Sequence, residues 1–149
     1  MLRWISVNGV VRAGYGVASG AGSVEFPEGS VRMQLPHFAE RGLDLSDLHP
    51  ATLNVDISPH SFTLPRPEFT FPGIKWSPEH PAEDFSFSPC RVATAGEVFG
   101  GYVYYPHPAT KPAHRHPSSV VEVLAPYIPE IEYGRRVVLE LARGEVSVT

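Results

Sequence analysis

The chain has 149 residues, with 16 prolines, 13 glycines and a formal net charge of −4. This length predicts a single domain, residues 1–149, that can bury a substantial core. No basic stripe runs along the sequence, which argues against a nucleic-acid partner. The prolines and glycines disfavour long helices, so the composition predicts a mainly β fold of short strands, either a barrel or a sandwich.

The first apolar run, Trp4–Val7, predicts a strand and leads into a glycine-rich segment. Glycines at 14, 16 and 20 allow backbone amides to approach and cradle a phosphate. The segment lacks the Gly-Lys-Ser/Thr ending of a P-loop and the third glycine of a dinucleotide fingerprint. A glycine-rich hairpin of a β-protein therefore remains an equal alternative. The candidate nucleotide-binding residues are Gly14, Tyr15, Gly16, Val17, Ala18 and Ser19.

A short helix is predicted at His37–Arg41, ended by Gly42, and the next strand at Leu53–Ile57. Thr52 and Asn54 lie two positions apart, so in a strand both side chains point to the same face. Their hydroxyl and amide oxygens are hard ligands of the kind that Mg²⁺ accepts. Neither side chain is charged, so such a metal would need an anionic ligand, most simply a nucleotide phosphate. The alternative is a strand that ends at a turn.

Prolines at 59, 65, 67, 72, 78, 81 and 89 interrupt the region between Ser58 and Cys90. Such a run does not fit a regular central strand. We expect a long ordered loop that its aromatic side chains hold against the barrel. In the functional alternative, one or two rings form a wall for a flat ligand. These aromatic residues are Phe62, Phe69, Phe71, Trp76, Phe85 and Phe87.

Further strands are predicted at Val98–Tyr105, Val120–Leu124 and Val137–Leu141. The middle one contains a single acid, Glu122. In a strand Glu122 shares a face with Val120 and Leu124, which leaves it half buried and in need of a partner.

Three motifs follow one another along the chain. Residues 9–16 read Gly-Val-Val-Arg-Ala-Gly-Tyr-Gly, and residues 52–55 read Thr-Leu-Asn-Val. Residues 117–126 read Pro-Ser-Ser-Val-Val-Glu-Val-Leu-Ala-Pro. Taken in this order, the three motifs resemble those of the archaeal CTP-dependent riboflavin kinases. The likeness extends from about Ile5 to Leu141, with a looser middle third.

The resemblance implies a small six-stranded cradle-loop β-barrel with one or two short helices. Residues 14–19 would lie against the phosphates of CTP, and Thr52 and Asn54 would bind Mg²⁺. Glu122 would contact the flavin, and His114 stands at the other flavin-side position. The implied reaction is phosphoryl transfer from CTP to the primary hydroxyl of riboflavin or a related acceptor, with Asn54 and Glu122 as the candidate catalytic residues.

Several positions depart from the pattern of that family. Ala18 and Ala51 replace glycines, and His114 replaces a threonine. The link at 127–132 is shorter and more acidic than in the family. These departures leave open an alternative in which the barrel has lost or changed its chemistry and binds a flavin, a nucleotide or a protein partner.

A second alternative is a metal site of the cupin type. His114, His116 and Glu122 are similar to the His-x-His and glutamate ligands that hold a transition metal in that family. The five residues between His116 and Glu122 exceed the usual spacing there, and the short remaining chain leaves no room for the second cupin motif.

The lone cysteine, Cys90, excludes an internal disulfide and fits a reducing compartment. We expect a core thiol rather than a nucleophile. No long apolar stretch precedes Gly9, so neither a signal peptide nor a membrane span is expected. These observations predict a cytoplasmic protein without a membrane partner.

Overall fold

The computed structural model describes residues 3–13, 30–110, 117–129 and 131–149. The described part is mainly β, and the strands predicted from the apolar runs are all present. The elements are β1 (Trp4–Arg12), α1 (Ser30–Glu40), β2 (Leu53–Asp56), β3 (Phe62–Thr63), β4 (Phe69–Ile74), β5 (Glu83–Thr94), β6 (Glu97–Pro106), β7 (Val120–Leu124), β8 (Arg136–Ala142) and β9 (Ser147–Val148).

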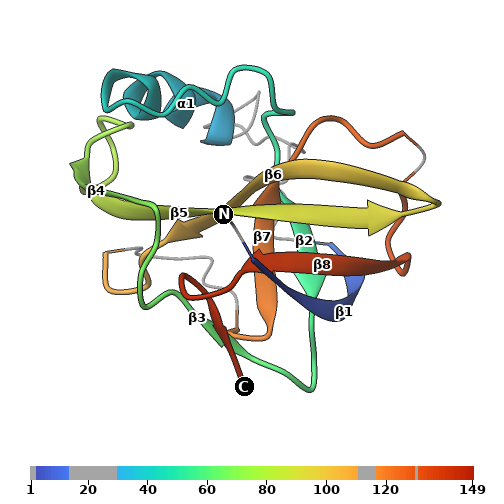
Figure 1. Ribbon diagram of the computed structural model, residues 1–149. Helices are drawn as coiled ribbons and strands as arrows, with labels where there is room; N and C mark the ends of the chain where they lie inside the picture. Colours follow the sequence, from blue (N-terminus) through green and yellow to red (C-terminus); the bar gives the residue numbers. More distant parts are fainter. Residues whose placement is uncertain (1–2, 14–29, 111–116, 130) are drawn as a thin grey trace.

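The strands close into a six-stranded antiparallel β-barrel, which confirms the predicted fold class (Figure 1). The order around the ring is β5-β6-β7-β2-β1-β8, and β5 pairs with both β6 and β8. Strand β4 extends the sheet along the free half of β5. Strands β3 and β9 form a separate small sheet on the side of the barrel away from α1.

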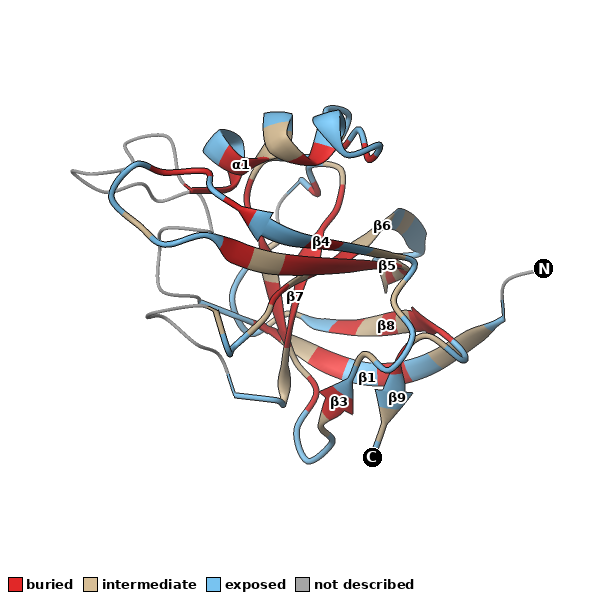
Figure 2. Ribbon diagram, turned by 90° about the vertical axis from the view of Figure 1, so that its left-hand side faces the viewer, coloured by how far each residue is buried: buried red, intermediate tan, exposed pale blue. Residues whose placement is uncertain are grey.

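Two hydrophobic cores lie on opposite faces of the same sheet. The inner core fills the barrel and includes Val7, Val11, Val55, Cys90, Val92, Val103, Val121, Val123, Leu139 and Leu141. The outer core lies between α1 and the sheet and includes Val31, Phe38, Leu43, Leu45, Phe71, Ile74, Trp76, Phe85, Phe87, Tyr104 and Leu124. Figure 2 shows the resulting burial along β5 and β7. Strands β6 and β7 therefore contribute side chains to both cores.

Cys90 lies fully inside the inner core, as expected for a structural thiol. Burial raises the pKa of this thiol far above its ordinary value, which removes the thiolate that a nucleophile needs.

Helix α1 is longer than the predicted segment at 37–41 and contains Pro36 in its interior. Its buried residues are spaced as one helical face, at Ser30, Val31, Gln34 and Phe38. Phe38 packs edge-on against two aromatic rings of β5 in the outer core. The free energy gained by this packing outweighs the cost of Pro36 inside the helix. This explains why α1 begins earlier in the sequence than the predicted helix. As predicted, the helix ends before Gly42, whose φ is 106°.

No helix among residues 3–13, 30–110, 117–129 and 131–149 is long and apolar enough to cross a membrane.

The prediction of a long loop between Ser58 and Cys90 is wrong. This region contains β4 and most of β5, which at 12 residues is the longest strand of the barrel. Proline is tolerated because Pro89 lies where β5 changes partner. Pairing with β4 ends at Phe87, and pairing with β8 begins at Cys90. A missing backbone N–H costs least at such a junction.

Gly101 of β6 lies close to the backbone at the end of β7. A Cβ atom built at this position would lie 2.0 Å from the carbonyl oxygen of Leu124, whereas one built at Gly100 would have no neighbour within 4 Å. Backbone atoms cannot yield as a flexible side chain can, so only glycine fits at 101 without a shift of β7.

Gly101→Ala should therefore lower the free energy of unfolding by about 1–3 kcal/mol, the usual cost of overpacking. The melting temperature of a chain of this size should then fall by about 2–4 °C per kcal/mol. Gly100→Ala is the matched control and should melt close to the wild-type temperature. Equal melting temperatures for the two variants would show that the β6–β7 contact is not tight.

Candidate functional site

The two predicted metal ligands lie at buried positions, Asn54 in β2 and Thr52 directly before that strand. Thr52 is 7% exposed and Asn54 is 2% exposed. Val55 lies in the inner core, so Asn54 points to the opposite, outer face of the sheet. Thr52 Oγ1 and Asn54 Oδ1 have no hydrogen-bond partner among the described residues. A buried polar oxygen without a partner is costly, so this pair is a candidate for binding a ligand.

Glu122 of β7 lies directly opposite Asn54 of β2, and Arg12 of β1 lies opposite Asn54 on its other side. Residues opposite each other in antiparallel strands share a face and have Cβ atoms about 4.5–5.5 Å apart. The barrel register therefore joins Asn54 and Glu122, which are far apart in the sequence. Glu122 is 7% exposed, more deeply buried than the half-buried position expected for it.

Tyr104 of β6 continues this row of side chains on the other side of Glu122. The register pairs Tyr102 with Leu124 and Val103 with Val123, which brings Tyr104 opposite Glu122. Burial and then the charge of the Glu122 carboxylate raise the pKa of Tyr104 above its ordinary value, which agrees with this placement. The row across four neighbouring strands is Tyr104, Glu122, Asn54 and Arg12. The sequence predicted a strand here but gave no sign of Tyr104, because only the pairing of β6 with β7 identifies it.

A cavity of about 170 Å³ adjoins Thr52 and Asn54. Tyr127 and Tyr133 line it and are 67% and 70% exposed, which is unusual for rings of this size. The ring of His49 meets Tyr127 edge-on at 5.4 Å between centroids. The volume is smaller than that of a typical site for a whole ligand, but it suits one flat ring of a larger ligand.

Arg12 lines the same cavity and provides its positive charge. Its Nε lies 3.6 Å from Oδ2 of Asp56, and the Arg12 side chain is 54% exposed. Such an exposed ion pair is weak and leaves the guanidinium available to an anion. Hydrogen bonds from the hydroxyl and the backbone amide of Ser58 hold the pKa of Asp56 below its ordinary value, with a smaller effect of Arg12. Arg12 was not among the site residues predicted from the sequence, although the alternation along β1 would have placed it outside the barrel.

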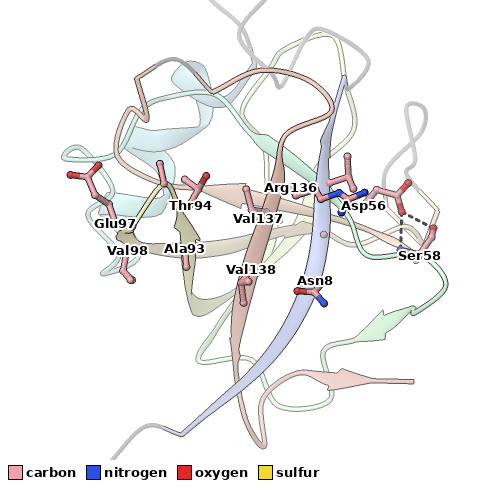
Figure 3. Close-up of a pocket in the computed structure, with 14 residues that line it drawn as sticks. Asn8, Asp56, Ser58, Ala93, Thr94, Glu97, Val98, Arg136, Val137 and Val138 are labelled. Carbon is pink, nitrogen blue, oxygen red and sulfur yellow. Dashed lines mark hydrogen bonds between the residues drawn. The ribbon is translucent and has the colours of Figure 1, made fainter.

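A larger groove of about 870 Å³ lies on the outside of the barrel (Figure 3). Glu97 and Val98 of the β5–β6 hairpin line one end, while Asp56 and Ser58 line the other. Asp56 accepts hydrogen bonds from the backbone amide and hydroxyl of Ser58 at 2.9 and 2.6 Å. None of the predicted site residues in the described part of the chain lines this groove, and it shares no described lining residue with the Thr52–Asn54 cavity.

None of the aromatic residues named between 58 and 90 lines the Thr52–Asn54 cavity, and the alternative of a ring wall for a flat ligand stays a prediction. Phe71, Trp76, Phe85 and Phe87 are buried in the outer core, and Phe62 is buried in the inner core. The exposed rings beside this cavity instead come from Tyr127 and Tyr133.

Several predicted residues lie outside the described part of the chain. These are the glycine-rich segment at 14–19 and the two histidines His114 and His116. The expected phosphate contacts, the flavin-side position and the cupin-type metal site therefore stay predictions. Within the described ranges, no group of three or more histidine, cysteine, aspartate or glutamate residues could hold a metal ion.

No family model matches the sequence, and no curated protein matches it. The function must therefore be argued from the residues and the geometry.

Thr52→Val tests whether the buried hydroxyl lacks a partner. The substitution keeps the side-chain shape but removes the oxygen, so the free energy of unfolding without ligand should rise by about 1 kcal/mol. Thr70→Val is the matched control, because the Thr70 hydroxyl lies 2.9 Å from that of Ser86. This control should lose about 0.5–1.5 kcal/mol. Chemical denaturation measures both values, and a destabilised Thr52→Val would contradict the assignment.

Proposed function

We propose that the protein is a Mg²⁺-dependent phosphotransferase that moves a phosphoryl group from CTP to the primary hydroxyl of riboflavin or a related acceptor. The observation that carries this proposal is the pair of buried oxygens of Thr52 and Asn54, which have no partner among the described residues. Their position at a cavity, beside an arginine and opposite a buried glutamate, supports it. The resemblance to the archaeal CTP-dependent riboflavin kinases suggests the donor and the acceptor.

The two oxygens fit a magnesium ion better than a transition metal. A hydroxyl and an amide carbonyl are hard, neutral ligands, and Mg²⁺ typically completes such a set with water and phosphate oxygens. When bound, the ion would neutralise negative charge on the phosphates of the donor. Thr52 and Asn54 would hold it, and the Arg12 guanidinium would supply a further positive charge to the phosphates.

The cavity between β2 and residues 125–128, 131 and 133 suits the base of the nucleotide. It is close to the size of one ring system, and it opens beside Thr52 and Asn54. The exposed faces of Tyr127 and Tyr133 provide surfaces on which a base can stack. The phosphates of a nucleotide bound there would extend towards Arg12 and the metal-binding oxygens.

In the proposed reaction, the acceptor hydroxyl oxygen attacks the γ-phosphorus in line. A new P–O bond forms to the acceptor, the bond to the β-phosphate oxygen breaks, and CDP leaves. The hydroxyl proton passes to Glu122 or, through it, to solvent. Glu122 lies opposite Asn54, so one carboxylate can orient the acceptor beside the metal-binding oxygens.

Asn54→Ala should lower FMN formation more than about 100-fold, because it removes a ligand of the ion that neutralises transition-state charge. The assay is incubation with riboflavin, Mg²⁺ and either CTP or ATP, followed by chromatography. Asn8→Ala, an exposed amide on β1, is the matched control and should keep wild-type activity. An active Asn54→Ala protein would contradict the assignment of Asn54 as a metal ligand.

Wild-type protein that is folded and forms no FMN with either donor would overturn the proposed reaction. Titration with riboflavin and with CTP would then show whether the barrel binds either molecule without catalysis.

A further inference from the structure

The outer face of β6, β5, β8 and β1 carries a row of apolar side chains. The strand register aligns Val98, Ala93 and Val138 across three strands, and the row ends at Asn8 of β1. The three apolar side chains point to the same side of the sheet, along the groove of Figure 3. Val98 is 56% exposed. A continuous row of exposed apolar side chains is more typical of an interaction surface than a single one.

The neighbouring row on this face contains one positive and one negative charge. Arg91 of β5 lies opposite Glu140 of β8 in the register. Nη2 of Arg91 lies 2.9 Å from Oε2 of Glu140, and the two side chains are 39% and 18% exposed. Cζ of Arg91 also lies 4.6 Å from the centroid of the Trp4 ring. The ion pair and the ring hold the guanidinium in place, which lowers the entropy that it would lose on binding a partner.

Both ends of this charged row are flat. The row continues to Gly100 of β6 on one side and to Ser6 of β1 on the other. A Cβ atom built at Gly100 would have no neighbour within 4 Å, and Ser6 is exposed. A second surface can therefore approach Arg91 and Glu140 without meeting a large side chain on either side of them.

The order of the charges makes this face complementary to itself. Arg91 and Glu140 lie on either side of the line that separates β5 from β8. In a second copy placed face to face and related by a two-fold axis along this line, Glu140 would face Arg91 of the first copy. Arg91 of the second copy would face Glu140 of the first. The same axis would place Ala93 against Val138 in both directions. Reciprocal contacts of this kind define an isologous dimer.

We propose that this face is the interface of a homodimer, in which Arg91 and Glu140 of the two copies form a cluster of alternating charges beside the apolar row. A partner with charges of one sign would meet a like charge at one of these two residues, so the face favours a second copy over a nucleic acid. The proposal does not rest on the proposed function, because neither row lines the Thr52–Asn54 cavity.

Sedimentation equilibrium of the full chain, between about 10 µM and 1 mM, measures the dissociation constant of the dimer. Val98→Glu should raise this constant at least about 30-fold, because it introduces an unpaired carboxylate into an apolar contact. Met33→Glu is the matched control. Met33 is 38% exposed and lies on α1, away from this face, so its substitution should leave the constant unchanged.

Charge reversal tests the pairing across the interface. Arg91→Glu and Glu140→Arg should each be monomeric alone, because like charges would then face each other between the two copies. An equimolar mixture of the two variants should form a heterodimer, since their clusters carry opposite charges. Circular dichroism shows whether each variant is folded. If a charge reversal does not fold, the comparison of Val98→Glu with Met33→Glu still decides.

Three results would contradict the proposal. Wild-type protein that stays monomeric up to about 1 mM would overturn it, and the face would then be open to a different partner. A dimer that persists in Val98→Glu would show that the interface lies on another face. Folded charge-reversal variants that stay monomeric after mixing would exclude the pairing of Arg91 with Glu140 between copies.

Discussion

The pairing of β5 with both β6 and β8 is the contact on which the architecture depends. It closes the ring, so every barrel strand acquires an inside and an outside. The first half of β5 extends along β4 and carries Phe85 and Phe87 into the outer core. Helix α1 packs on those rings and shields Tyr104 on the outer face from solvent.

The barrel strands are thus buried on the inner face by the inner core and, under α1, on the outer face as well. This is why the row of polar side chains across β6, β7, β2 and β1 is informative about a binding site. A polar side chain on the outside of an ordinary barrel meets water at no cost. Tyr104, Glu122 and Asn54 are each less than 10% exposed, so each requires a partner inside the protein or a ligand. Three buried polar side chains thus occupy neighbouring positions of one row, and Asn54 of this row borders a cavity. Other buried polar residues, such as Ser77, Glu83 and Ser88, lie elsewhere. Such concentration is typical of a binding or catalytic site.

The features of the site that depend only on residues close together in the sequence could be predicted. The period-two alternation of a strand is enough to put Thr52 and Asn54 on one face and to bury Glu122 in an apolar run. Register is not local, so the sequence could not show that Asn54 faces Glu122 or that Tyr104 adjoins it. The proline rule failed at β5 because the rule concerns a strand with continuous partners, and Pro89 lies between two of them. The short helix expected at 37–41 was extended by tertiary packing on Phe38.

The seam between β6 and β7 is short, with register pairs at Tyr102–Leu124 and Val103–Val123 in the described part of the chain. Breaking the strand pairing at two residue pairs costs much less free energy than unfolding the whole barrel. Amide hydrogens along this seam would therefore exchange with solvent through a local opening, while the long β5–β6 and β1–β8 ladders stay protected. Because Tyr104 and Glu122 lie on opposite sides of the seam, the same opening would part them and admit water to the row. The ladder with the fewest register pairs in the ring thus runs beside the buried polar row on the outer face of the barrel.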